Sequence, residues 1–221
     1  MGRRVKEARA NRCRHIALLA LLTVATQALA MDSPSALGDA LVAQLRELPA
    51  PLPVGVGRNL PESEILRARL YAELGSLRTE GVQALARGYG DPDVRLRRNV
   101  ALALVSLGMG HDSTLPQTDL EPALASMIAA LADSDADVRA WSAQALASLK
   151  ERAAPAVPAL IVMLEREGEG DQLNACGALR GIGAPARDAL PALRQELSSP
   201  YQNVRWCAGG AIESLQGKSP Q

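Results

Sequence analysis

The stretch DADVRAWSAQALASL, Asp135 to Leu149, carries the pattern that decides the fold of this chain. Counted from Val138, small and apolar residues fall at offsets five, seven, eight and eleven, which an α-helix brings onto one face. They are Ala143, Ala145, Leu146 and Leu149. The acids just before Val138 are of the type that caps a helix N-terminus and complements its dipole. The stretch therefore predicts a capped helix that buries one face.

The same spacing recurs along the chain. Val94, Asp171 and Val204 take the zero position in three further segments, so that consecutive anchors lie 44, 33 and 33 residues apart. The intervening segments also repeat, since Pro-Ala-Leu stands at 158–160 and again at 191–193. A fixed period of this length is the signature of a solenoid of stacked units. The longer first spacing predicts an 11-residue insertion, which we place in the loop Gly108–Thr118.

Each unit is predicted to contain two helices. A first helix of the DxDVR type is followed by a short turn and a second helix that carries xxPALxxxL. Pro158 and Pro191 are expected early in that second helix, where a missing N–H is tolerated. Upstream, SALGDALVAQLRELP has apolar residues at helical spacing, and a Pro- and Gly-rich connector follows it. We expect this N-terminal helix to cover the open end of the solenoid; a free N-terminal segment is the alternative.

These motifs resemble HEAT repeats, and in particular the short bilin-lyase-type HEAT-like repeat. The resemblance rests on D-x-D/N-V-R, A-x-A-L-x-x-hydrophobic and P-A-L, and it covers the chain from Pro61 to Gly217. It implies an all-α fold, a right-handed α-solenoid of about four to five HEAT-like helix pairs. The chain then divides into an N-terminal helix and connector (31–61), a repeat domain (62–217) and a C-terminal tail (218–221). The third unit departs from the pattern, because Asp171-Gln172 stands in place of Val-Arg.

The first thirty residues have the features of a secretory signal. MGRRVKEARANRCRH is basic, IALLALLTVATQALA is a short apolar run, and the run ends in an A-x-A cleavage site before Met31. The run is too short and too weakly bounded to span a bilayer stably. An uncleaved interfacial helix is the alternative. We therefore expect residues 1–30 to be a signal peptide and the protein to be secreted, with the periplasm as its compartment.

Removal of this signal changes the charge balance. Six of the 24 basic residues and one of the 24 acids lie in 1–30, which leaves 18 basic and 23 acidic residues, a net charge of −5. Nucleic-acid binders need clustered Lys and Arg to neutralise phosphates, and anionic membrane surfaces attract the same residues. The composition therefore argues against nucleic acid as a partner, and against a membrane once the signal is cleaved.

Residues for catalysis or cofactor binding are scarce. The mature chain has one histidine, His111, in the predicted insertion loop, where a lone histidine is usually solvated. The sequence lacks a His-rich zinc pattern, a nucleophile elbow, a phosphate-binding loop and a dinucleotide fingerprint. We therefore predict no catalytic residue, no cofactor and no metal ligand.

A cluster of acids and arginine precedes most of the first helices. A catalytic carboxylate pair needs a distinct environment, whereas a cluster that recurs at every unit is better explained by stacking. We interpret these clusters as structural joints, in which the acids cap the helix and the arginine bridges to an acid of the adjacent unit. The predicted joint residues are Asp91, Asp93, Arg95, Asp135, Asp137, Arg139, Asn203 and Arg205.

Cys176 and Cys207 are the only cysteines of the mature chain, and they lie in first helices of neighbouring units. Export permits a disulfide between them if both side chains face the contact between the two helices. The alternative is that both are small buried hydrophobic residues. The pair is therefore a candidate disulfide.

The surface residues suggest a protein partner. Aromatic residues are rare, so exposed ones are candidate hot spots for binding, and partial packing between units is the alternative. The second helices carry charges of both signs and are expected to line the concave contact surface. Our candidate partner-binding residues are Trp141, Trp206, Tyr201, Arg187 and Arg194.

The sequence thus predicts an exported, non-catalytic HEAT-repeat scaffold that binds a protein partner. Two alternatives stay open. The resemblance allows a bilin-lyase-like subunit that handles a tetrapyrrole, and an assembly or stability factor of an envelope complex is equally compatible with a solenoid.

Overall fold

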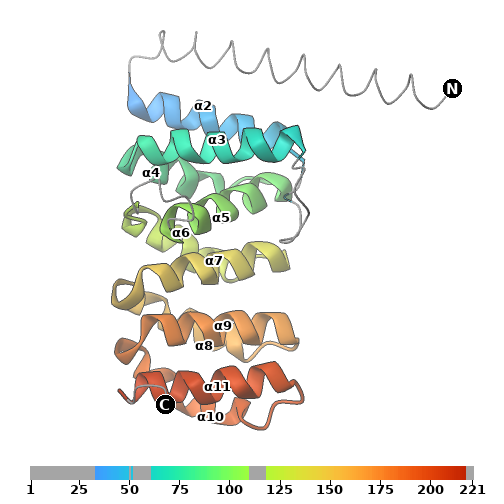
Figure 1. The fold of residues 1–221 in the computed structure, drawn as a ribbon, viewed down its shortest axis with the longest axis vertical. Helices are drawn as coiled ribbons and strands as arrows, with labels where there is room; N and C mark the ends of the chain where they lie inside the picture. The colour runs from blue at the N-terminus through green and yellow to red at the C-terminus, as the bar shows by residue number, and fades with distance from the viewer. Residues whose placement is uncertain (1–32, 50, 52–60, 110–117, 218–221) are drawn as a thin grey trace, which may run out of the picture.

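A computed structural model describes residues 33–49, 51, 61–109 and 118–217. This part of the chain is all-α and forms a solenoid, as the repeat pattern predicts (Figure 1). Its α-helices are α2 (Pro34–Glu47), α3 (Glu62–Ser76), α4 (Thr79–Gly88), α5 (Val94–Met109), α6 (Leu124–Ala130), α7 (Ala136–Ser148), α8 (Val157–Leu164), α9 (Glu169–Ile182), α10 (Leu190–Glu196) and α11 (Gln202–Leu215). Three 3-10 helices lead into second helices: η1 (Glu121–Ala123), η2 (Lys150–Ala156) and η3 (Ala184–Ala189).

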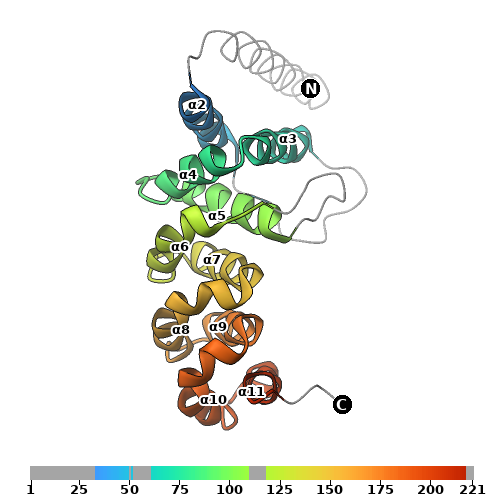
Figure 2. The same ribbon diagram turned by 90° about the vertical axis from the view of Figure 1, so that its left-hand side faces the viewer.

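The helices stack in two layers (Figure 2). One layer holds α3, α5, α7, α9 and α11, and the other holds α4, α6, α8 and α10, with α2 beyond α4. Consecutive members of the first layer pack directly on each other, as α7 does on both α5 and α9. Each helix therefore buries one side against its own unit and another against the neighbouring unit, as stacking of repeats requires.

The core between the layers is built from alanine and leucine. In α7, Val138, Ala143, Ala145 and Leu146 are fully buried, so the register predicted from the sequence holds there. Ala side chains let first-layer helices approach closely, and leucines from both layers fill the space between them. Pro158 and Pro191 are the second residues of α8 and α10, where no intrahelical bond is lost.

The predicted register of α5 is wrong by two residues. Leu96, and not Val94, is the buried residue that corresponds to Val138, and Leu104 and Leu107 continue its face. Both Val94 and Leu96 are apolar, so the sequence fits either choice. The spacing between the first two anchors is therefore 42 residues, which exceeds the 33-residue period by nine, so the insertion is nine residues long. Most of the loop assigned to it, 110–117, lies outside the described residues.

Helix α2 packs onto the N-terminal end of the stack. Its Leu41 and Leu45 are buried in the common core, and it contacts α3, α4 and α5. The fully buried Asn99 of α5 connects three helices at this end. Its Nδ2 donates to Leu45 O of α2 (3.1 Å), and its Oδ1 accepts from Arg67 Nε of α3 (2.8 Å). The connector after α2 lies almost entirely outside the described residues, as does the predicted signal.

The stack forms a shallow arc, and its curvature corrects one expectation. In Figure 2 the arc opens towards the layer of α3, α5, α7, α9 and α11. The first helices therefore line the concave side, whereas the sequence analysis had assigned this side to the second helices. We call the exposed side of α7, α9 and α11 within this concavity the inner face.

Candidate functional site

The structure places the acid–arginine cluster of α7 at the contact between units. Arg139 Nε lies 3.0 Å from both carboxylate oxygens of Asp171 in α9, and its Nη2 lies 2.9 Å from Oδ2. Its Nη1 donates to the carbonyl oxygens of Asp133 and Ser134 at 2.9 and 3.1 Å. One guanidinium therefore closes the turn before its own helix and binds the acid of the next unit.

The preceding unit repeats this arrangement with a different arginine from the one predicted. Arg97 Nε and Nη2 bind the carboxylate of Asp133 at 2.7 and 3.0 Å, and its Nη1 donates to the carbonyls of Asp91 and Pro92. Arg95 does not join the units, because it pairs with Asp93 in its own turn at 2.7 Å. This correction has the same cause as the shifted register, since Arg97 follows Leu96 as Arg139 follows Val138.

Asp135 and Asp137 have different roles. Asp135 is the N-cap of α7 and accepts from Val138 N at 3.2 Å, while Arg98 of α5 binds both of its oxygens. The hydrogen bond from Arg98 holds the pKa of Asp135 below its usual range, against the opposing effect of burial. Asp137 does not cap the helix; its exposed carboxylate lies 3.4 Å from Arg98 Nε.

The pKa of Asp133 is also lowered. Burial works to raise it, but the hydrogen bonds from Arg97 and from the Asp135 N–H outweigh burial. Both acids are thus held as carboxylates by fixed cations and N–H groups. A carboxylate held in this way is a poor proton donor near neutral pH, so the geometry fits structural ion pairs better than general acid catalysis.

The contact between α9 and α11 uses other groups. Gln172 replaces the arginine, and its Oε1 accepts from Ser199 Oγ at 3.4 Å. Asn203 Nδ2 donates to Glu169 Oε1 at 2.8 Å, so this predicted joint residue does bridge two units. Arg205 keeps the bonds from Nη1 to the preceding turn, at 2.7 and 3.0 Å, without an acid of a further unit in the described residues.

Cys176 and Cys207 meet across the contact of α9 with α11. Both are free thiols in the structure, so the candidate disulfide is not formed there. A hydrogen bond with Cys207, together with burial, raises the pKa of Cys176. The same hydrogen bond lowers the pKa of Cys207, because the Cys176 S–H stabilises its thiolate. We therefore expect Cys207 to be the more reactive thiol of the pair.

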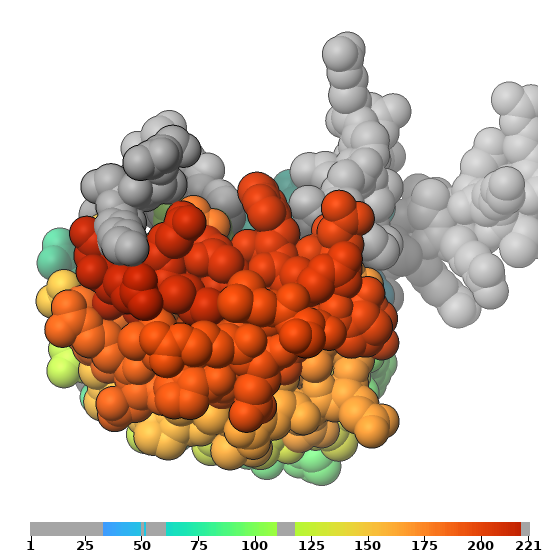
Figure 3. Space-filling view, turned by 90° about the horizontal axis from the view of Figure 1, so that it is seen from below, coloured from blue at the N-terminus to red at the C-terminus, as the bar shows by residue number. Residues whose placement is uncertain are grey.

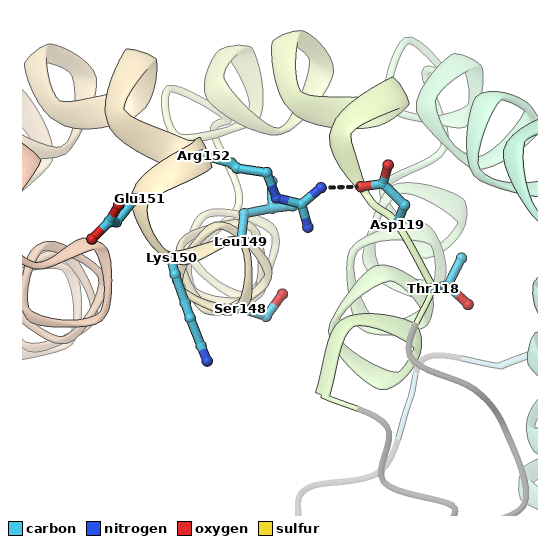
Figure 4. A pocket seen from close by; sticks show the side chains of 7 residues that line it. All are labelled: Thr118, Asp119, Ser148, Leu149, Lys150, Glu151 and Arg152. Atoms are coloured by element: carbon cyan, nitrogen blue, oxygen red, sulfur yellow. Dashed lines mark hydrogen bonds and ion pairs between the residues drawn. The ribbon is translucent and has the colours of Figure 1, made fainter.

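One open pocket of about 450 Å³ lies where the turn after α7 meets the start of η1 (Figure 4). An ion pair between Arg152 Nη1 and Asp119 Oδ1 (2.7 Å) spans it, and both side chains are more than half exposed. Ser148 is its only hydroxyl on a helix, and that hydroxyl donates to Ala145 O at 2.6 Å. Lys150 points away from the ion pair in Figure 4. The pocket thus offers polar groups, and its Ser148 hydroxyl is bonded to a backbone carbonyl rather than to a base.

The candidate partner-binding residues do not form one cluster. Trp206 is 82% exposed and lies in the first turns of α11, five residues after Tyr201, which is 37% exposed. Trp141 of α7 is partly buried and packs against the core. Arg187 is exposed at η3, where its Nε donates to Leu215 O at 3.1 Å, and Arg194 is exposed on α10 in the other layer.

The inner face holds exposed groups that the sequence analysis missed. Leu173 of α9 is 37% exposed, although a leucine in a helical pattern is usually assigned to the core. Gln144 Nε2 of α7 donates to Asn174 Oδ1 of α9 at 3.2 Å, which forms an amide bridge across this face. Beyond its chain neighbours and the backbone of its own helix, no atom lies within 4 Å of the position of a Cβ on Gly177. The repeat pattern contained a signal for these residues. It defines the buried side of each first helix, and residues on the opposite side of that helix are therefore expected to be exposed.

The described residues contain neither a metal-binding group nor a membrane-spanning helix. No group of three or more His, Cys, Asp and Glu side chains there could hold a metal ion. In the same ranges, no helix is both long and apolar enough to cross a membrane. His111 lies outside the described residues.

Comparison with known proteins identifies the repeat. Residues 60–146 match the family model described as HEAT repeats. The chain is similar to a designed armadillo repeat protein solved with the peptide (KR)4, with 18% identity, a TM-score of 0.57 and coverage of 81% of this chain and 82% of that one. An engineered protein is similar at 20% identity, with a TM-score of 0.58 and 81% of each chain covered. No curated protein matches the chain.

Proposed function

We propose that the chain is an exported, non-catalytic scaffold that binds an extended protein segment along its inner face, a proposal supported by the match of residues 60–146 to the HEAT-repeat family model. Repeat solenoids of this architecture are interaction scaffolds, because stacked units generate a long continuous surface. The related designed armadillo protein was solved with a peptide, which is consistent with this use of the fold.

The observation that carries the proposal is the composition of the inner face. It combines exposed apolar side chains, Leu173 and Trp206, with the bridged amides of Gln144 and Asn174 and the open surface at Gly177. Apolar side chains supply contact area, amides offer donors and acceptors to a peptide backbone, and a glycine lets a chain approach closely. A face that is neither strongly basic nor strongly acidic favours a protein segment over nucleic acid.

The ion pairs support a non-catalytic role. The buried Arg139 and Asp171 are bonded to each other at the contact between two units, and the partly buried Arg97 and Asp133 make the equivalent pair one unit earlier. Their charges therefore hold neighbouring helices together, which is a structural role.

Photo-crosslinking tests the contact surface. Benzoylphenylalanine at position 144 or 177, on the inner face, is expected to capture a partner in the native cells. The matched control is position 162, because Val162 of α8 is 63% exposed in the other layer. With the captured partner purified, Leu173→Asp should weaken binding and Val162→Asp should not. Equal capture at position 162, or equal loss of binding, would refute the inner face as the contact surface.

Export is tested on the same cells. If residues 1–30 are a cleaved signal, the protein recovered from the envelope or medium begins at Met31. Recovery of the uncleaved chain from the cytoplasm would contradict export but would leave the binding proposal standing.

A further inference from the structure

The C-terminal end of the stack exposes a helix face that the other units bury. Ala101 of α5, Ala143 of α7 and Cys176 of α9 occupy equivalent positions, and all three are fully buried beneath the next unit. The equivalent residue of α11 is Gly209. It is partly exposed, and a Cβ added to it would meet no atom within 4 Å beyond its chain neighbours and the backbone of its own helix. Figure 3 looks onto this end, where α10 and α11 present a broad surface.

Arg205 on this face is oriented for a carboxylate. Its Nη1 donates to the carbonyls of Ser199 and Pro200 at 2.7 and 3.0 Å. Arg97 and Arg139 make the same two bonds to their own preceding turns, and each then binds an aspartate of the next unit through Nε and Nη2. The Nε and Nη2 of Arg205 have no such partner among the described residues. The preceding turn thus holds Arg205 in the pairing geometry without an acid to pair with.

The acid that suits Arg205 lies on the same helix face. Arg205 is the one cation of α11 and Glu213 the one anion, and each stands four residues from Gly209. Residues four apart follow one stripe of a helix, and Arg205 and Glu213 are separated by about 12 Å along the axis. Glu213 is exposed and has no ion pair within the described part of the chain.

We propose that this face binds a second copy of the chain, with the two α11 helices antiparallel about a two-fold axis that passes by Gly209. A two-fold contact uses the same patch on both copies, so each Arg205 lies opposite the partner's Glu213. Gly209 at the axis allows close approach of the two helices, since no side chain separates them there. Trp206, one residue from Arg205 and 82% exposed, becomes covered at the edge of the contact.

Charge complementarity favours a second copy over an acidic partner. An acidic segment would satisfy Arg205 but would also lie against Glu213, whose like charge repels it. A second copy places opposite charges together twice and leaves no like charges opposed.

Sedimentation velocity over a range of concentrations tests the contact. The chain should pass from monomer to dimer and no further, because a two-fold contact is closed. Glu213→Arg and Arg205→Glu should each weaken dimerisation about tenfold or more, because both place like charges opposite each other. An equimolar mixture of the two variants should dimerise again, since every contact in the mixed dimer then joins opposite charges. Recovery in the mixture also shows that Arg205→Glu still folds.

Glycine substitutions provide an independent test with a matched control. Gly209→Gln should prevent dimerisation with an unchanged circular dichroism spectrum, because Gly209 is helical and a Cβ added there has open space around it. Gly177→Gln is the control, since Gly177 is also helical and open but lies on α9, away from this end. A chain that stays monomeric at every concentration, assemblies that grow beyond a dimer, or an unchanged dimer for Glu213→Arg would each overturn the proposal.

Discussion

Arg139 of α7 binds both carboxylate oxygens of Asp171 in α9, 32 residues further along the chain. The side chain of Arg139 is 11% exposed and that of Asp171 is 9% exposed. An ion pair this far from water gains strength from weak screening, but each partner would be costly to bury alone. The pair therefore makes the stacking of two units depend on both side chains at once.

Arg139→Met tests this dependence. It should lower the free energy of unfolding by about 2–3 kcal/mol, because Asp171 then stays buried with only the partly exposed Arg166 nearby. The measurement is urea denaturation followed by circular dichroism. Replacing both partners, Arg139→Met with Asp171→Leu, should recover most of the loss. The control is Arg152→Met, whose exposed pair with Asp119 should contribute about 0.5 kcal/mol or less. Equal losses for Arg139→Met and Arg152→Met would contradict the buried-pair argument.

The inner ladder of α7 gives a second prediction. Leu146 is fully buried, so Leu146→Arg places an unpaired charge in the core and should unfold the domain at room temperature. Gln144 lies two residues away on the exposed side of the same helix, so Gln144→Arg should melt as the unchanged protein does. Thermal melting by circular dichroism distinguishes the two, and a cooperative melt of Leu146→Arg at the original temperature would refute the register.

Acid sensitivity follows from Asp135, whose folded-state pKa is lowered chiefly by Arg98. A lowered pKa contributes stability that is fully present above the ordinary aspartate value of about 3.9, and the contribution is lost as the pH falls through the folded pKa. Asp135→Asn removes it. The variant should therefore be less stable than the unchanged protein at pH 7, and the difference should shrink as the pH falls below about 4.

Denaturant titrations at several pH values measure this difference. The control is Asp188→Asn, because Asp188 is exposed in η3 and makes no ion pair within the described residues. If the difference in the free energy of unfolding between Asp135→Asn and the unchanged protein instead stays constant with pH, the contact with Arg98 does not stabilise the fold by lowering the pKa of Asp135.

The two thiols should differ in reactivity. The hydrogen bond from Cys176 lowers the pKa of Cys207, and Cys207 is the more accessible of the two. Cys13 of the predicted signal is replaced by serine, so that only two thiols remain. Cys207 should then react first with a disulfide reagent, and Cys176 should react only as fast as the protein unfolds. In Cys176→Ser the thiol donor becomes a hydroxyl, so a changed pH profile for Cys207 would verify the coupling. Equal reaction rates for Cys176 and Cys207 would contradict the predicted difference in reactivity. If no free thiol can be titrated in the unfolded, unreduced protein, the two cysteines form a disulfide.

The joints show how far sequence reasoning reaches. The role of Arg139 follows from its repetition, because a cluster that recurs at a fixed period points to a contact between units rather than to a site. The choice between Arg95 and Arg97 does not follow, since Val94 and Leu96 are both apolar and either can anchor α5. Packing decides, because burial of Leu96 turns Arg97 towards Asp133.

The identity of the capping acid has a similar basis. From the sequence, Asp135 and Asp137 are both plausible caps of α7. The structure distinguishes them, because Val138 N donates its hydrogen bond to Asp135. Such a bond depends on the path of the turn before the helix, which the stacked units fix and local sequence does not.

The helical solenoid follows from the amino-acid sequence, because the period of 33 residues and the spacing of small and apolar residues require stacked helices with one buried side. The packing of the folded chain sets which layer is concave, which arginine reaches which acid, and which side of α11 the other described residues leave uncovered. These properties depend on the rotation of each helix and on the small angle between successive units. A one-residue change of register alters both, while the periodic pattern of the sequence stays almost the same.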